Sequence, residues 1–312
     1  MNKIFIFFIA FFLLGGAKDK AALKKEIINF DEKIREYYVS LPEDTSKPFP
    51  IIINFHGFLS HAMDQQGFSQ MDNYAHQNGI GVIYPEGVKR SWNVGKAILN
   101  DENDIGFVNA LIDSVSLKYN IDSNRIYACG FSNGGTFSYE LICGLSNKIA
   151  AFGSVGGNFS INENRLCNID REIPLIHIHG TRDRLQKYNH SDGDFLSTIE
   201  SVNYWAKYNQ LDIKVVENME DIHKKEGTTV EKHTYSKNNS NTQVIHFKVV
   251  KGGHLWLGSP IADWLTLRIF FGRNNHEINS SKELVDFFLE AEGFPEIQFS
   301  TAALKFLQKQ VY

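Results

Sequence analysis

Residues 125–134 read RIYACGFSNG, a short apolar run followed at once by Gly-x-Ser-x-Gly. Beyond this stretch, residues 136–145 have the apolar spacing of a helix. A serine on a tight turn between a strand and a helix exposes its hydroxyl at the edge of a sheet, and the crowded backbone needs small residues two positions before and after it. Ser132 is therefore the candidate nucleophile.

The rest of the chain alternates between short apolar runs and helical patterns. Runs with strand character cover residues 37–39, 51–55, 80–84, 126–129, 175–179 and 244–250. Helical spacing marks residues 105–119, 136–145 and 281–289. This alternation predicts an α/β fold, a mostly parallel sheet with helices on both faces in a single domain, with its ligand site at the carboxyl ends of the strands. Residues 217–241 are polar, and we expect them to form a surface excursion between two core strands.

Charge and composition exclude several classes of protein. The 312 residues include 32 Lys and Arg against 36 Asp and Glu, a net charge of −4, and no run of five like charges occurs. This composition is not that of a disordered, collagenous or coiled-coil chain. It gives no electrostatic footprint for nucleic acid or for an anionic membrane, so we expect a neutral or small partner. The sequence makes no prediction of the oligomeric state.

The N-terminus has the pattern of a secretory signal. Lys3 is followed by an apolar run over residues 4–14 and then by two glycines and Ala17. The run is shorter than the about 20 residues that a membrane-spanning helix needs. We therefore expect a signal peptide over residues 1–17, a mature domain over residues 18–312, and a secreted or periplasmic protein that leaves the membrane after cleavage.

Three cysteines become informative if the chain is exported, because thiols outside the cytoplasm tend to pair. Cys129 lies in an apolar run, where a buried free thiol is expected. Cys143 and Cys167 lie 24 positions apart in polar surroundings and are the candidate disulfide. Three free thiols remain the alternative.

The partners of a catalytic serine are expected downstream of it. A serine hydroxyl needs a histidine to take its proton and a carboxylate to orient that histidine, and in this topology the order is serine, acid, histidine. Asp183 follows the strand predicted at residues 175–179, and His254 follows the strand predicted at residues 244–250. They are the candidate acid and base, with Asp192 and Asp194 as rival acids.

Two further features belong to the same hypothesis. Acyl transfer needs donors for the oxyanion, and we expect the backbone N–H groups of Asn133 and Phe58 to supply them, although Gly57 before Phe58 can also be a plain turn residue. His177 and His179 alternate as metal ligands do, but no Cys/His cluster accompanies them. We therefore predict no metal site and no cofactor, and take His177 as a core residue.

These motifs together resemble a known family. The matching stretches are His56-Gly57, Tyr84-Pro85-Glu86-Gly87, Ser91-Trp92-Asn93, Asp104 to Val108, Tyr119 to Asp122, Arg125 to Tyr127, Gly130 to Gly135, His179 to Asp183, Gly252 to Trp256 and Ile278 to Ser281. From residue 37 to residue 289 the chain resembles the secreted polyhydroxybutyrate depolymerases and feruloyl esterases, α/β-hydrolases that include carbohydrate esterase family 1. The family usually has a paired Asp where this chain has Asn103-Asp104, and Pro where it has Leu257.

The resemblance implies an α/β-hydrolase fold and a Ser132, Asp183 and His254 triad, which the spacing indicated independently. It also implies that Trp92 and Trp256 lie near the pocket and bind substrate, although both could equally be core aromatics. Aromatic rings beside a catalytic serine suit an aryl acyl group or a sugar face. We therefore expect a serine esterase that forms an acyl-enzyme on carbohydrate-linked feruloyl or acetyl esters of plant polysaccharide. The alternatives are a hydroxyalkanoate depolymerase, a serine peptidase and a non-catalytic carbohydrate-binding protein.

Overall fold

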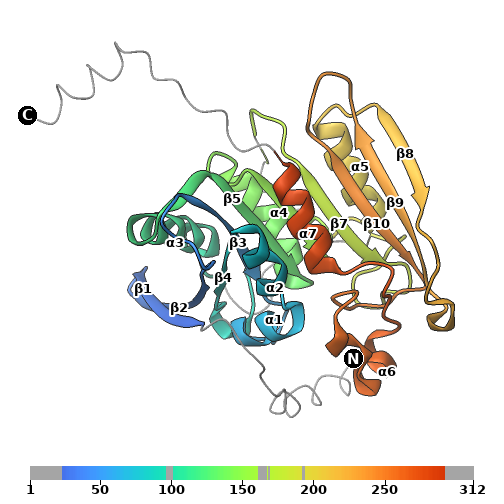
Figure 1. Ribbon diagram of the computed structural model, residues 1–312, viewed down its shortest axis with the longest axis horizontal. Helices are drawn as coiled ribbons and strands as arrows, with labels where there is room; N and C mark the ends of the chain where they lie inside the picture. The colour runs from blue at the N-terminus through green and yellow to red at the C-terminus, as the bar shows by residue number, and fades with distance from the viewer. Residues whose placement is uncertain (1–22, 96–100, 161–166, 168, 192–193, 292–312) are drawn as a thin grey trace, which may run out of the picture.

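The structure is a computed structural model that describes residues 23–95, 101–160, 167, 169–191 and 194–291. The predicted signal peptide at residues 1–17 and the rival acid Asp192 lie outside these ranges. Within them, the strands form one sheet in the order β1-β2-β4-β3-β5-β6-β7-β10-β9-β8 (Figure 1). The strands are β1 (Lys24–Phe30), β2 (Lys33–Ser40), β3 (Phe49–Phe55), β4 (Gly81–Pro85), β5 (Ile121–Phe131), β6 (Ala151–Val155), β7 (Leu175–Gly180), β8 (Ile213–Asn218), β9 (Thr229–Ser236) and β10 (Val244–Val250).

The centre of the sheet is parallel, as the alternation of strands and helices predicts. Strands β4, β3, β5, β6, β7 and β10 run in one direction, while β1 and β2 at one edge and β9 and β8 at the other are antiparallel. Strands β3, β5, β7 and β10 therefore end at the same edge. Each central strand is buried on both faces, which explains its nearly unbroken apolar sequence.

Helices cover both faces of this sheet, and each face has its own hydrophobic cluster. The helices are α1 (Ala62–Ser69), α2 (Asp72–Ala75), α3 (Asp104–Lys118), α4 (Asn133–Leu145), α5 (Thr198–Tyr208), α6 (Leu265–Phe271) and α7 (Ser280–Glu290). One cluster packs α3, α4 and α5 against the sheet, and the other packs α1, α2 and α7 against the opposite face (Figure 1). Alternate residues of β3 follow this division, since Ile51 and Ile53 join the first cluster and Ile52 joins the second.

Residues 217–241 lie at the surface, as expected, but part of this segment belongs to the sheet. Residues 217–218 end β8 and residues 229–236 form β9, and these two antiparallel strands extend the sheet beyond β10. Every residue of β8 is exposed, and in β9 only Val230 is buried. Edge strands with so little buried surface need no apolar run, which is why their polar sequence resembles a loop.

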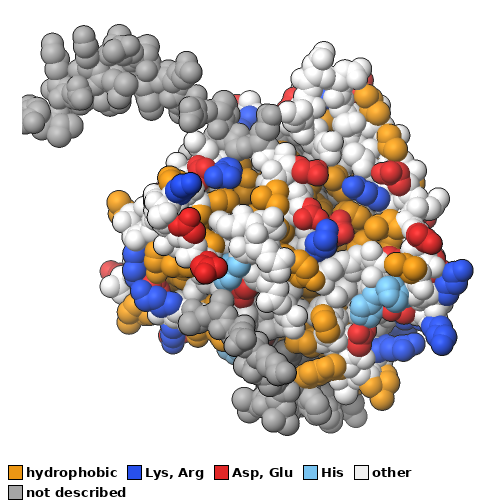
Figure 2. All heavy atoms as spheres, in the orientation of Figure 1, with side chains coloured by type: hydrophobic (Ala, Val, Ile, Leu, Met, Phe, Trp, Pro, Cys, Tyr) orange, Lys and Arg blue, Asp and Glu red, His pale blue; other side chains and the backbone are white. Residues whose placement is uncertain are grey.

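The cysteines are arranged as predicted. A disulfide joins Cys143 near the end of α4 to Cys167, with their Cα atoms 4.6 Å apart, and Cys129 in β5 is a buried free thiol. Charged side chains of both signs are interspersed over the face in Figure 2. Within the described ranges, no helix has the length and apolar character needed to cross a bilayer.

Candidate active site

Ser132 lies on the sharp turn between β5 and α4, with φ 53° and ψ −114°. Its N–H donates to the carbonyl of Val155 at 2.8 Å, and the side chain is half-buried. A Cβ atom at Gly130 would lie 2.5 Å from the carbonyl carbon of Gly134, and one at Gly134 would lie 2.4 Å from the carbonyl oxygen of Phe55. The motif therefore needs both glycines because three backbone segments meet at this turn.

Asp183 and His254 meet at the same edge of the sheet, where β7 and β10 end. Nδ1 of His254 donates to Oδ2 of Asp183 at 2.6 Å. Oδ1 of Asp183 accepts from the N–H groups of Leu185 and Gln186, both at 2.8 Å. Burial by itself raises the pKa of Asp183, but attraction to His254 and hydrogen bonds from His179 and His254 hold that pKa well below its usual range. The carboxylate is thus ionised and oriented toward the imidazole.

Ser132 lies just beyond the end of β5, near His254, but is not hydrogen-bonded to it. The ring of Phe131, next to Ser132, is centred 4.9 Å from the ring of His254. A Cβ atom at Gly156, next to the carbonyl that binds Ser132, would lie 3.4 Å from the same imidazole. Among the described residues, no hydrogen bond joins the Ser132 hydroxyl to His254. Such contacts are often long in unliganded enzymes and shorten when substrate binds.

A chain of buried side chains reaches Asp183 from the other side. Nε2 of His179 is 2.9 Å from the carbonyl of Gln186 and 3.1 Å from Oδ2 of Asp183. Nδ1 of His179 is 3.1 Å from Nε2 of His177, whose Nδ1 is 2.5 Å from the hydroxyl of Tyr139.

The acceptors at the Asp183 end fix the direction of the hydrogen bonds between these side chains. A carbonyl and a carboxylate can only accept, so Nε2 of His179 carries a proton. With His179 neutral, Nδ1 accepts from Nε2–H of His177, and Nδ1 of His177 accepts from the Tyr139 hydroxyl. This arrangement was not predicted from the sequence. The alternation of His177 and His179 on one face of β7 is the signal that could have found it.

The loop after β3 lies against Ser132, where an oxyanion donor is expected. A Cβ atom at Gly57 would lie 3.6 Å from Cβ of Ser132, which places Phe58 one residue from this contact. Asn133 begins α4, and its side chain exchanges two hydrogen bonds with the backbone of Trp92, at 2.7 and 3.1 Å. The Asn133 amide group therefore ties the loop around Trp92 to the turn, while its backbone N–H remains the candidate donor.

Trp92 and Trp256 are core side chains, as the alternative interpretation has it, and not substrate-binding ones. They are only 2% and 0% exposed. Trp92 stacks on Phe137 and donates its indole N–H to the carbonyl of His56, while Trp256 donates to the hydroxyl of Ser281. Both rings fill the interior and both polar atoms have partners, so neither offers a face to a substrate.

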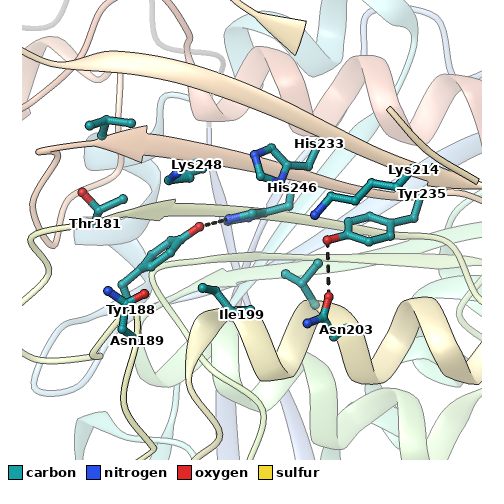
Figure 3. Close-up of a pocket in the computed structure, with 12 residues that line it drawn as sticks. Thr181, Tyr188, Asn189, Ile199, Asn203, Lys214, His233, Tyr235, His246 and Lys248 are labelled. Atoms are coloured by element: carbon teal, nitrogen blue, oxygen red, sulfur yellow. Dashed lines mark hydrogen bonds between the residues drawn. The ribbon is translucent and has the colours of Figure 1, made fainter. Parts of the chain in front are cut away.

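Two hollows flank the carboxyl ends of β7 and β10. The first, about 320 Å³, lies between α5 and strands β8 to β10 (Figure 3). In it the Tyr188 hydroxyl bonds to His246 at 2.7 Å, and Lys248 and His233 both contact Glu231 at 3.0 Å. The second, about 600 Å³, is lined by Arg182, Asp183, Arg184, Lys251, Arg268, Gly272 and Arg273. Within the described ranges, no three His, Cys, Asp or Glu side chains are grouped to hold a metal ion.

Known proteins resemble this chain in sequence and in fold. Residues 39–238 match the model of the protein family described as phospholipase/carboxylesterase, a range that includes Ser132 and Asp183 but ends before His254. A bifunctional acetylxylan esterase/xylanase from Neocallimastix patriciarum is 30% identical over 161 residues, which cover 51% of this chain and 23% of that protein. Feruloyl esterase B from Piromyces equi is 29% identical over 177 residues, which cover 52% of this chain and 33% of that protein. The chain thus spans a third or less of these two relatives.

Solved structures support the fold. The acetyl xylan esterase from Aspergillus awamori has a TM-score of 0.56 and 14% identity, and the match covers 74% of this chain and 94% of that one. The predicted α/β-hydrolase fold is confirmed, as is the predicted resemblance to feruloyl esterases.

Proposed function

The chain belongs to the phospholipase/carboxylesterase family, and from this premise we propose that it is a serine esterase that hydrolyses carboxylic esters through an acyl-enzyme on Ser132. The observation that carries the proposal is the 2.6 Å hydrogen bond between Asp183 and His254, at the sheet edge where Ser132 follows β5. An imidazole with a carboxylate on Nδ1 has Nε2 available to take a proton.

The proposed reaction has two halves. Oγ of Ser132 attacks the ester carbonyl while Nε2 of His254 takes its proton, and the imidazolium then gives that proton to the departing alcohol. The N–H groups of Asn133 and Phe58 donate to the carbonyl oxygen while it is negatively charged. A water molecule, deprotonated by His254, then attacks the acyl-enzyme, and the imidazolium returns the proton to Oγ of Ser132 as the bond to the acyl group breaks and the acid is released. Asp183 stays ionised throughout and stabilises the imidazolium.

We propose feruloyl or acetyl esters of plant polysaccharide as substrates. The relatives named as acetylxylan esterase and feruloyl esterase support this class. A secreted or periplasmic location fits the N-terminal apolar run and the Cys143–Cys167 disulfide, since such bonds persist in oxidising compartments.

Replacing the nucleophile tests the mechanism. Ser132→Ala should lower kcat for 4-nitrophenyl acetate on the order of 10⁶-fold. It should also abolish labelling by a fluorophosphonate while leaving the circular dichroism spectrum unchanged. Ser116→Ala, an exposed serine on α3, is the matched control and should keep full activity. Undiminished hydrolysis or labelling in the Ser132 variant would refute the acyl-enzyme.

The substrate class is tested separately on the wild-type protein. Methyl ferulate, acetylated xylan and hydroxybutyrate oligomers are offered at equal ester concentration, and kcat/KM is compared. We expect one or both plant-derived esters to exceed the oligomers. A clear preference for the hydroxybutyrate oligomers would contradict the proposed substrate.

A further inference from the structure

The hollow beside Asp183 is lined by basic side chains from three parts of the chain. Arg182 and Arg184 lie on the loop after β7, on either side of Asp183. Lys251 follows β10, three positions before His254. Arg268 belongs to α6, and Arg273 follows it. The two loops that position the acid and the base of the candidate triad therefore also carry three of the five cations.

These five positive charges face a single carboxylate in the hollow. Asp183 is the one carboxylate in its lining, and both oxygens of Asp183 already accept hydrogen bonds. In the described part of the chain, the side chains of Arg182, Arg184, Lys251 and Arg268 form no ion pair. The guanidinium of Arg273 donates to the carbonyl oxygens of residues 226 and 227, at 3.4 and 3.1 Å.

Several cations elsewhere in the molecule do have acidic partners. Lys33 contacts Glu102, Lys118 contacts Glu26, and Lys248 in the neighbouring hollow contacts Glu231. Figure 2 shows acidic and basic side chains interspersed over the visible face. A concave cluster of five cations in a chain of net charge −4 is held together against its own repulsion, and a bound anion would relieve that repulsion.

The backbone at Lys251 is a second indication that the positive charges of the hollow have a role. It has φ 63°, in the left-handed region that a lysine seldom adopts, and its N–H donates to the hydroxyl of Thr181 at 2.8 Å. A glycine would make this turn with less strain, yet the turn places an ammonium group in the lining of the hollow.

We propose that this hollow, the basic subsite, binds the carboxylates of an acidic polysaccharide and that hexuronate units of the substrate chain are its ligand. Planar guanidinium groups bind carboxylates through two parallel hydrogen bonds, and several of them can engage successive uronates. A concave hollow suits a polymer chain better than the surface of a bilayer. This proposal rests on the proposed esterase function, because the hexuronate chain is the polymer that would carry the ester.

Binding is measured on the Ser132→Ala protein, so that hydrolysis does not interfere. Polygalacturonate and the neutral polymer dextran are titrated by calorimetry in 50 mM and 500 mM NaCl. We expect polygalacturonate to bind at least roughly 10-fold more tightly than dextran in low salt, and to lose this advantage in high salt because the charges are exposed.

The triple variant Arg184→Gln, Lys251→Gln and Arg268→Gln then tests the location. Each removed charge should cost roughly 2- to 5-fold in affinity, and the three together roughly 10- to 100-fold. Lys47→Gln is the control, since Lys47 is an exposed lysine in the loop that enters β3, at the opposite edge of the sheet. A triple variant that keeps all three charges, Arg184→Lys, Lys251→Arg and Arg268→Lys, should lose less affinity than the Gln variant, because it removes two guanidinium groups but no charge.

Three outcomes would overturn the proposal. The first is equal affinity for polygalacturonate and dextran. The second is a loss of affinity in the Lys47 variant as large as that in the triple variant. The third is binding to phosphatidylserine vesicles that is as strong as binding to polygalacturonate and as sensitive to the triple variant, which would indicate a lipid surface. The two proposals fail separately. An active Ser132→Ala protein that binds polygalacturonate refutes only the mechanism, and an inactive one without this binding refutes only the basic subsite.

Discussion

His254, beyond the end of β10, and the histidines inside the sheet have opposite surroundings. His254 lies beyond β10, and its partner is the carboxylate of Asp183. His177 and His246 lie within β7 and β10, and their partners are neutral, Tyr139 for the first and Tyr188 for the second. Burial lowers the pKa of His246 to about 3 and holds that of His177 well below its usual value. The same residue type can thus transfer protons where a carboxylate meets it and serve as a rigid hydrogen-bonding unit where none does.

The largest effect should come from removing the histidine outside the sheet. His254→Ala takes away the proposed base, and kcat for 4-nitrophenyl acetate should fall on the order of 10⁴- to 10⁶-fold. His223 is a partly exposed histidine, and the control variant His223→Ala should leave the rate unchanged. If the His254 variant keeps more than a tenth of the activity, the distinction between the two groups of histidines is lost.

His179 connects the two groups, and its replacement should have an intermediate effect. It contacts both Asp183 and His177, so we expect it to position the acid. His179→Phe removes the N–H donor but keeps a ring, and kcat should fall about 10- to 100-fold with KM little changed.

His179→Gln is the matched variant for this test, because its amide can still donate toward Asp183. It should recover most of the lost rate. Equal rates in the Phe and Gln variants, or an effect on KM alone, would show that His179 only packs.

The smallest effect concerns stability and pH. The folded-state pKa of His246 is about 3, below the value near 6.5 expected in the unfolded chain. Between these two values the unfolded chain binds a proton that the folded protein does not, so stability is lost as the pH falls from about 6.5 toward 3. His246 should account for roughly 2 kcal/mol of the loss between pH 6.5 and pH 5.

Urea unfolding of the wild-type protein and of His246→Gln at both pH values measures this share. The variant should lose about 2 kcal/mol less than the wild type over the same interval. Equal losses in the two proteins would mean that His246 is not held neutral by the fold.

Most of the fold could be predicted because its central strands are buried on both faces and therefore have apolar sequences. The runs at residues 51–55, 175–179 and 244–250 lie within or coincide with β3, β7 and β10. The candidate acid and base followed from the ends of two of these strands. Their catalytic roles, like that of Ser132, remain predictions.

The features that the sequence did not reveal depend on contacts between distant segments. The cations of the basic subsite lie between residues 182 and 273 and form no run, so charge patterning indicated only a neutral or small partner. Trp92 and Trp256 have the residue type of a pocket wall, but their burial depends on packing that no local pattern contains. The pair β8 and β9 lacks an apolar run because it adds to the edge of an already complete core.

The backbone conformation at Ser132 lowers the stability of the fold in favour of the proposed activity. At φ 53° and ψ −114° a side chain is unfavourable, typically by about 1–3 kcal/mol, and glycine would remove most of that cost. Random replacements selected only for heat resistance should therefore enrich Ser132→Gly, a protein that outlasts its parent and has lost its hydroxyl. Engineering for higher thermal stability must therefore keep serine at position 132 and change other positions.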